Sequence, residues 1–316
     1  MTIPAPPPFG AGRFAPSPSA DLHVGNLRTA LLAWLFARSS GRRFLVRMED
    51  LDRVVPGADA AQLADLAAIG LDWDGPIVHQ SQRGSSYQDA IARLSARGLT
   101  YECFCTRREI REAASAPHPD PAFPERLTAD GSYPGTCRPL TEADIAAHRR
   151  SGRPSALRLR AGVDDWTISD ELTGAFTGAV DDLVLRRNDG IAAYNLAVVV
   201  DDAGQGVDQV VRGADLLTSA PRQAYLAWLL GLPAVGYAHV PLALNADRRR
   251  LAKRDGAVTL TDLAHRGRTP EQVLRTLALS LRLAVPGEPV SPRGLLARFD
   301  PAALPREAWI VDPATL

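Results

Sequence analysis

The feature that most constrains the fold is an alternation of short apolar runs and amphipathic segments in the first 70 residues. "GRFAPSP" (12–18) predicts a strand end that turns into a loop at its two prolines. "GNLRTALLAWLFARSSG" then places four leucines and a phenylalanine on one helical stripe and stops at Gly41. "FLVRMEDLD" is a second strand candidate and "ADAAQLADLAAIG" a second helix. This order predicts an α/β fold with a Rossmann-like, doubly wound parallel sheet.

The middle third of the chain breaks this alternation. It contains all three cysteines, a Pro-rich stretch and short strand-like runs such as "ALRLRA", and the alternation resumes near residue 186. We therefore expect an inserted module within the α/β domain and a short helical C-terminal tail. The expected division is a flexible Pro-rich arm (1–11), the first half of the Rossmann-like domain (12–98), the inserted cysteine-bearing module (99–185), the second half of that domain (186–245), and a segment that contains the single lysine, followed by a helical tail (246–316).

Composition excludes few classes of protein. The formal net charge is zero, which argues against nucleic-acid binding through a global basic field but permits a local basic face. The N-terminus lacks the pattern of a signal peptide, and the longest apolar run, "ALLAWLFA" (30–37), is far shorter than the roughly 20 residues of a membrane span. Three cysteines do not form a disulfide framework. We expect a cytoplasmic protein, monomeric and without a membrane partner.

The loop after the first strand is a candidate nucleotide site. Neither G-x-G-x-x-G nor a P-loop follows that strand, and "APSPSADLHVGN" (15–26) stands there instead. His23, Gly25 and Asn26 lie at the head of the helix, where free N–H groups and a partial positive charge favour an anion. Taken alone, an ordinary helix cap with an incidental histidine explains the pattern equally well.

Lys253 is the single lysine among 36 basic residues, and it lies in "RRRLAKRDGA" (248–257). A surface charge would be served by Arg or Lys, whereas a compact ammonium on a flexible stem suits a different task from a planar guanidinium. Chance placement is the alternative. The position becomes informative if this window is special for another reason.

Two segments together resemble the class I aminoacyl-tRNA synthetases. "PSPSADLHVGN" resembles their first signature, and "RRLAKR" (249–254) is similar to their second, the lysine-bearing loop. The resemblance implies that His23, Gly25, Asn26 and Lys253 bind ATP, which enters with Mg²⁺, and that His23 and Lys253 are catalytic. Lys253 would neutralise charge on the phosphates as pyrophosphate leaves. The chain departs from the signatures at Asn26, Arg250 and Ala252.

Four further segments narrow the resemblance to the glutamyl-tRNA synthetase group over residues 12 to 260. They are "GRFAPSPSADLHVGNLRTAL", "LVRMEDLD", "YNLAVVVDD" and "VVRGADLL". Glutamate carries two carboxylates and one ammonium, so its pocket needs cationic forks and one anion. Arg13 and Arg212 fall at strand ends, where open α/β sheets bind ligands, and Glu49 suits the ammonium. Singly, each residue also fits a surface charge or a partly buried tyrosine. The resemblance implies that glutamate is contacted by Arg13, Phe14, Ala15, Pro16, Ser17, Glu49, Tyr194 and Arg212.

The cysteines form a candidate metal site. Cys103 and Cys105 in "YECFCTRRE" and Cys137 in "GSYPGTCRP" suit one structural Zn²⁺ bound by thiolates. Spacing alone favours His118 or a water as the fourth ligand, whereas the glutamyl-queuosine branch of the family uses a tyrosine spaced as in "YPGTC", which implies Tyr133. Three buried apolar cysteines are the alternative.

The length of the chain bears on its substrate. Full glutamyl-tRNA synthetases continue beyond the lysine loop with a large helical region, but only 60 residues follow Gly256 here. The resemblance is therefore to the truncated glutamyl-queuosine branch of ligases, and it implies that there is no anticodon-binding domain. It implies activation of glutamate with ATP, without tRNA, and transfer to queuosine at the wobble position in the anticodon loop of tRNA(Asp). Three alternatives are a compact enzyme that charges a tRNA 3′ end, a non-synthetase nucleotidylyltransferase, and a non-enzymatic regulatory paralogue.

Overall fold

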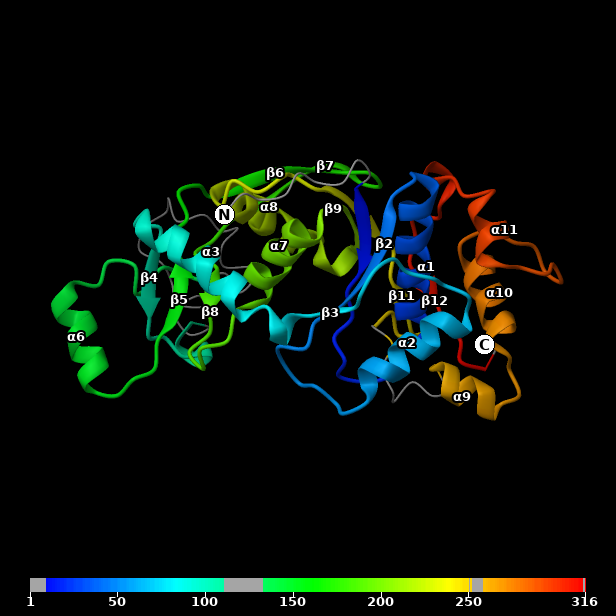
Figure 1. The fold of residues 1–316 in the computed structure, drawn as a ribbon, viewed down its shortest axis with the longest axis horizontal. Coiled ribbons are helices and arrows are strands. Elements are labelled where there is room, and N and C mark those ends of the chain that lie inside the picture. Colours follow the sequence, from blue (N-terminus) through cyan, green and yellow to red (C-terminus); the bar gives the residue numbers. More distant parts are fainter. Residues whose placement is uncertain (1–9, 111–132, 250, 252–257, 315) are drawn as a thin grey trace.

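A seven-stranded sheet forms the centre of the protein in a computed structural model that describes residues 10–110, 133–249, 251, 258–314 and 316 (Figure 1). Its strand order is β3-β2-β1-β9-β10-β6-β7, and every neighbouring pair is parallel except the β6–β7 hairpin. The predicted α/β fold with a mostly parallel sheet is confirmed. The strands are β1 (Ala11–Phe14), β2 (Arg43–Met48), β3 (Val78–His79), β6 (Asp165–Asp170), β7 (Gly174–Ala179), β9 (Val207–Gly213) and β10 (Gly236–Val240).

The helix predicted after the first strand is α1 (Val24–Ser39), and its apolar stripe is buried as the periodicity requires. It ends before Gly41, which has a positive φ of 71°. Helices cover both sides of the sheet (Figure 1). The others near the sheet are α2 (Ala58–Ala68), α3 (Gly84–Ala96), α7 (Tyr194–Gln205) and α8 (Ala220–Leu229), with short 3₁₀ turns η1 (Gln80–Gln82) and η2 (Ala214–Ser219).

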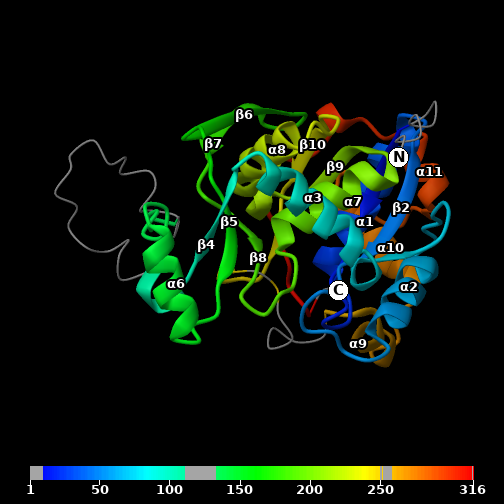
Figure 2. The same cartoon turned by 60° about the vertical axis from the view of Figure 1, so that its left-hand side comes forward.

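The residues assigned to the inserted module divide between two sheets. β4 (Thr100–Cys103), β5 (Ala156–Leu159) and β8 (Val184–Arg186) form a separate antiparallel sheet in the order β4-β5-β8. Together with α6 (Glu142–Arg150) this sheet lies at one end of the molecule (Figures 1 and 2). The β6–β7 hairpin belongs to the central sheet instead, because β6 pairs in parallel with β10, Asp170 opposite Tyr237.

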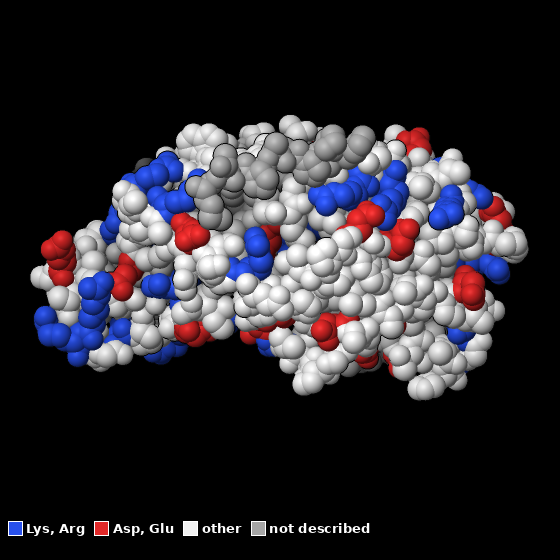
Figure 3. Space-filling view, in the orientation of Figure 1, with Lys and Arg blue, Asp and Glu red and all other residues white. Residues whose placement is uncertain are grey.

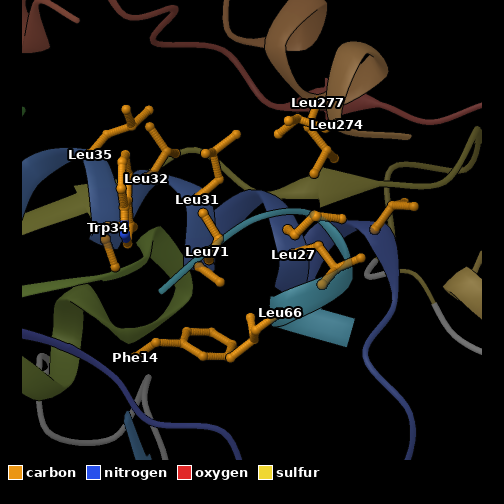
Figure 4. Packing of buried hydrophobic residues seen from close by; sticks show 14 of the residues in the cluster. Phe14, Leu27, Leu31, Leu32, Trp34, Leu35, Leu66, Leu71, Leu274 and Leu277 are labelled. Carbon is orange, nitrogen blue, oxygen red and sulfur yellow. The ribbon is translucent and has the colours of Figure 1, made fainter. Parts of the chain in front are cut away.

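The C-terminal residues pack against α1. The described part of this tail contains α9 (Leu260–His265), α10 (Pro270–Ser280), α11 (Pro292–Leu296) and η4 (Pro301–Ala303), and β12 (Trp309–Ile310) pairs with β11 (Ala243–Leu244). Leu274 and Leu277 of α10 face Leu27 and Leu31 of α1 (Figure 4). These four leucines belong to one buried cluster, so the tail is part of the main hydrophobic core. Burial of each leucine side chain contributes about 1.5–3 kcal/mol to folding. No helix in the described ranges is long and apolar enough to cross a membrane.

Gly25 explains how closely β11 approaches the head of α1. A Cβ at this position would lie 3.0 Å from Cβ of Ala243 and 2.9 Å from Cε1 of His23. A larger residue would therefore push β11 away from the start of α1. The glycine keeps the strand that precedes the lysine segment against the first turn of the helix.

Candidate active site

The head of α1 is closed by two reciprocal hydrogen bonds. His23 is the N-cap, and its Nδ1 accepts the N–H of Asn26 at 3.2 Å, while Asn26 Oδ1 accepts the N–H of His23 at 3.2 Å. Because Nδ1 is an acceptor, the neutral imidazole carries its proton on Nε2. The structure thus brings His23, Gly25 and Asn26 together at the helix end that favours anions. The two interpretations of His23, a helix cap and a residue of an anion site, are therefore compatible, because the cap itself lies at this end of the helix.

The turn between β1 and α1 is fixed from two sides. Glu49, just after β2, donates its N–H to the carbonyl of Pro16 at 2.9 Å. Gln62 of α2 is buried, and its Nε2 donates to the carbonyls of Ser17 at 3.0 Å and Ala20 at 2.7 Å. These bonds hold the turn in one conformation beside the sheet edge.

Lys253 lies outside the described residues, as do Arg250 and Ala252. The residues that flank this segment are Leu251 and Val258, and both belong to the buried cluster that includes Val24. Val24 also donates its N–H to the carbonyl of Val258 at 2.8 Å. The chain therefore packs with the first turn of α1 on either side of the lysine segment.

Two arginines and two carboxylates form a buried network at the ends of β1 and β2. Asp202 Oδ1, on α7, lies 3.1 Å from Nε of Arg13 and 2.8 Å from Nη1 of Arg47. Glu49 Oε1 lies 3.4 Å from Nη2 of Arg47. Burial alone would raise the pKa of Asp202, but the charges of Arg13 and Arg47 outweigh it and lower that pKa. Burial raises the pKa of Glu49, although both arginines oppose the shift.

Arg212 and Tyr194 are two more of the eight residues that the sequence predicts for glutamate. Arg212, in β9, is buried and donates from Nη1 to Oε1 of Gln223 at 2.7 Å. Tyr194 begins α7 and is 41% exposed. Partial burial and the Glu49 carboxylate raise the pKa of Tyr194, while Arg212 and Arg13 act in the opposite direction. Nη1 of Arg13 donates to the carbonyl of Val211, the residue before Arg212, at 3.4 Å, so the two arginines lie on neighbouring strands near their carboxyl ends.

The run Phe14–Ser17 divides by burial. Phe14 is 7% exposed, and its ring lies in the core beside Leu66 (Figure 4). This placement leaves the main chain of Phe14, rather than its ring, for a ligand at the sheet edge. Ala15 is half-buried, Pro16 is buried and Ser17 is exposed.

The three cysteines and Tyr133 come together in the small sheet. Cys105 Sγ is 3.5 Å from Cys137 Sγ, and Tyr133 Oη is 3.3 Å from Cys103 Sγ and 3.8 Å from Cys105 Sγ. A tetrahedral zinc with Zn–S bonds of about 2.3 Å has edges of about 3.8 Å, so these three distances are compatible with a zinc site. Tyr133 Oη also accepts the N–H of Cys137 at 2.7 Å, as a ligand oxygen can. His118 lies outside the described residues.

Several residues of the site were not predicted from the sequence. Arg47 and Asp202 complete the network around Arg13, and their sequence signals were the arginine in "LVRMEDLD" and the acidic pair that ends "YNLAVVVDD". The other side chains not predicted are Gln62, Asp170, Gln223 and His239. Each is a buried polar residue in an otherwise apolar strand or helix, or at its end. That pattern is the signal that could have identified them.

The sheet, the histidine-capped helix head and the arginines at the strand ends define the catalytic domain of a class I aminoacyl-tRNA synthetase. Residues 11–311 match the family model described as "tRNA synthetases class I (E and Q), catalytic domain", which makes the chain a ligase-type enzyme. Within that class it belongs to the family of glutamyl-Q tRNA(Asp) synthetases.

The relatives that show this family match nearly the whole chain. The chain is 66% identical over 309 residues to the glutamyl-Q tRNA(Asp) synthetase of Nocardia farcinica, covering 98% of this chain and 95% of the relative. It is 52% identical over 283 residues to the enzyme of the same name from Cutibacterium acnes, covering 88% of this chain and 78% of the relative. Among solved structures, a glutamate tRNA ligase of Elizabethkingia meningosepticum, in complex with its amino acid, matches with a TM-score of 0.79 and 26% identity. That match covers 96% of this chain and 67% of the ligase.

Proposed function

We propose that the enzyme forms glutamyl-adenylate from ATP and L-glutamate without tRNA, and then transfers glutamate to queuosine at the wobble position of tRNA(Asp). The observation that carries the proposal is that Arg13, Glu49 and Arg212 lie at or just after the carboxyl ends of three adjacent parallel strands, β1, β2 and β9, while Tyr194 begins the helix that leads into β9. Two cations, one anion and a phenol are the groups that a dicarboxylic amino acid requires. The names of the relatives support the choice of acceptor.

In this proposal Arg13 and Arg212 bind the two carboxylates of glutamate, and Glu49 binds its ammonium. An ammonium beside Glu49 would favour the ionised carboxylate and so offset the raised pKa that burial causes. The Ala15–Ser17 turn, with the main chain of Phe14, lines the same end of the pocket. Asp202 holds Arg13 through Nε at 3.1 Å, and Nη1 of Arg13 donates to the carbonyl of Val211 at 3.4 Å. In this proposal Nη2 and the second N–H of Nη1 contact the ligand.

ATP would bind at the head of α1. The partial positive charge at the N-terminus of α1 and the Nε2 proton of His23 suit phosphate oxygens, and Gly25 and Asn26 complete the turn. Lys253 would neutralise the charge that develops on the phosphates as pyrophosphate leaves. Mg²⁺ that enters with ATP would supply further charge neutralisation. The glutamate carboxylate attacks the α-phosphorus in line, a step that depends on positioning and charge more than on a general base. We therefore assign no general base.

Zinc would be structural. Cys103, Cys105, Tyr133 and Cys137 are the proposed ligands, and they join β4 to the chain that leads into α6. A metal bound by four protein ligands has no open position for substrate, so its contribution is to the stability of the small sheet.

A basic face on the small module is the proposed contact for the anticodon loop. The last turn of α6 contains His148, Arg149 and Arg150, and none of the helix's residues is buried. Basic side chains gather at this end of the molecule (Figure 3). Arg149 is partly neutralised by Glu102, at 2.5 Å. A local face of this kind attracts phosphates while the whole chain stays neutral.

Charging of purified tRNA tests the function. We expect labelled glutamate to enter tRNA(Asp) that contains queuosine, and neither tRNA(Asp) that lacks it nor tRNA(Glu). Charging of tRNA(Glu) alone would establish the compact glutamyl-tRNA synthetase instead. A nucleotidylyltransferase would consume ATP without any dependence on glutamate.

A further inference from the structure

We infer that Asp170 and His239 are positioning residues for Arg212, and that they fix the direction in which its guanidinium faces the amino acid. The inference rests on the proposed function, because it takes Arg212 to be a ligand of glutamate. The family resemblance assigns neither Asp170 nor His239 to the site. Their role follows from a chain of buried contacts.

Arg212, His239 and Asp170 form one continuous hydrogen-bonded chain. Arg212 Nε donates to His239 Nε2 at 3.0 Å, and His239 Nδ1 lies 2.6 Å from Asp170 Oδ2. The three residues are 4%, 2% and 3% exposed. A buried polar group that loses its partner is costly, so these contacts restrict the chain to one arrangement.

The contacts also define the protonation of the histidine. Arginine Nε is always a donor, so His239 Nε2 must accept and the ring proton lies on Nδ1, directed at Asp170. Burial lowers the pKa of His239, although the hydrogen bond to Asp170 acts in the opposite direction. The lowered pKa favours the neutral ring. Burial alone would raise the pKa of Asp170, but hydrogen bonds from His239, Thr173 and Leu172 outweigh it and lower that pKa.

Asp170 is itself held rigidly. It is the last residue of β6, and its Oδ1 accepts the N–H groups of Leu172 and Thr173, each at 2.9 Å. Its Oδ2 accepts the N–H of His239 at 2.9 Å, and β6 pairs with β10 at the neighbouring Tyr237. The β6–β7 hairpin, which lies between the strands of the small module in sequence, therefore supports the pocket from the far side of β10.

The other two nitrogens of Arg212 are also fixed. Nη1 donates to Gln223 Oε1 at 2.7 Å and Nη2 to the carbonyl of Leu216 at 3.2 Å. Gln223 in turn donates to Asn195, next to Tyr194, at 3.0 Å. A guanidinium held at all three nitrogens cannot turn without breaking a bond. Each Nη carries a second N–H, and together these two groups can make a two-point contact with a carboxylate.

Two substitutions at His239 separate the contacts. In His239→Asn the carboxamide stands near the position of Nδ1, so it can bond Asp170 but is too short to accept from Arg212. In His239→Gln the Oε1 atom can reach the position of Nε2 and accept from Arg212. Both variants are compared with wild type by ATP–pyrophosphate exchange, with KM for glutamate, KM for ATP, kcat and thermal midpoint as readouts.

We expect His239→Asn to raise KM for glutamate about 10- to 100-fold, the effect of losing a hydrogen bond to a charged group. KM for ATP and kcat at saturating glutamate should stay within about threefold, and His239→Gln should recover most of the loss in KM. A glutamate KM in His239→Asn equal to that of wild type would overturn the inference. So would parallel increases in both KM values, or a glutamine variant no better than the asparagine variant.

If His239→Asn does not fold, Asp170→Asn provides the same comparison. The isosteric amide weakens the support of His239, and we expect a rise in KM for glutamate of about fivefold with KM for ATP unchanged. An unchanged glutamate KM in a folded Asp170→Asn variant would also overturn the inference. Wild-type protein that shows no glutamate-dependent exchange would refute the proposed function itself, which is a distinct result.

Discussion

Asp202 Oδ1 lies 3.1 Å from Nε of Arg13, so a carboxylate on α7 holds an arginine of β1. The two residues are separated by 189 positions in the chain, and both are buried. Arg47 of β2 donates to the same oxygen at 2.8 Å. One carboxylate on α7 therefore links this helix to both β1 and β2, beside Arg13, a proposed ligand of glutamate.

Asp202→Asn should destabilise the fold and weaken glutamate binding together. It removes the anion between two buried guanidiniums, and loss of one partner of a buried ion pair costs about 3–5 kcal/mol. The free energy of unfolding in urea measures this change. Asp208→Asn is the matched control, because Asp208 pairs with Arg42 at 2.8 Å but is 43% exposed, and its loss should cost at most about 1 kcal/mol. Equal losses in the two variants would contradict this account of the network.

Asp65 of α2 should make stability depend on pH near neutrality. Burial, and then the charge of Asp21, raise the pKa of Asp65 to about 6. Because the folded-state pKa lies above the unfolded value of about 3.9, the ionised group costs stability above pH 6, and this cost disappears as the pH falls toward 4. Asp65→Asn should therefore stabilise the protein by about 1–2 kcal/mol at pH 7.5, after allowance for partial exposure, and by little near pH 4.

Urea unfolding at the two pH values checks the prediction for Asp65. Asp21→Asn removes the neighbouring charge and should give a smaller gain of the same sign. A gain in Asp65→Asn that is equal at pH 4 and pH 7.5 would mean that titration of this carboxyl is not the cause.

The fourth zinc ligand can be identified by two substitutions. Tyr133→Phe removes the phenol oxygen but keeps the ring on which the Arg158 guanidinium lies, 3.6 Å from the ring centre. We expect Tyr133→Phe to lower zinc affinity at least about tenfold in competition with a chelator, and His118→Ala to leave it unchanged. The reverse pattern would make His118 the ligand. Zinc content near zero in wild-type protein prepared with the metal would refute the site.

Lys253→Arg tests why the chain has a lysine at this position. A guanidinium keeps the charge but is bulkier and planar, so we expect adenylate formation to fall about 100-fold or more while the Kd for glutamate is unchanged. Lys253→Ala should abolish adenylate formation, again with glutamate bound normally. Arg293→Lys, on the exposed surface of α11, is the control and should be silent. Wild-type exchange in Lys253→Ala would remove the lysine from the mechanism.

The sequence predicted those parts of the site that depend on local pattern. Periodicity located α1 and β2, and the position of Arg13, Glu49 and Arg212 at strand ends followed from the parallel sheet. The partners of these residues depend on tertiary pairing and have no local signal. Nothing near Arg212 in sequence points to His239, 27 residues away, or beyond it to Asp170, 69 residues from His239.

The β6–β7 hairpin shows the same limit for the fold. Its residues lie between the strands of the small sheet in sequence, so composition and order group them with the module. The pairing of Asp170 with Tyr237 in β10 joins two strands that are distant in the chain. Parallel pairing of this kind depends on how the whole sheet assembles rather than on the alternation within either strand.

ATP–pyrophosphate exchange with glutamate in the absence of RNA tests the central claim most directly, because the claim is that one pocket binds a dicarboxylic amino acid beside ATP. We predict exchange that requires glutamate, is not supported by glutamine or aspartate, and needs no added tRNA. Exchange that is absent without RNA would contradict activation of free glutamate. Exchange supported equally by glutamine would contradict the assignment of two arginines to two carboxylates.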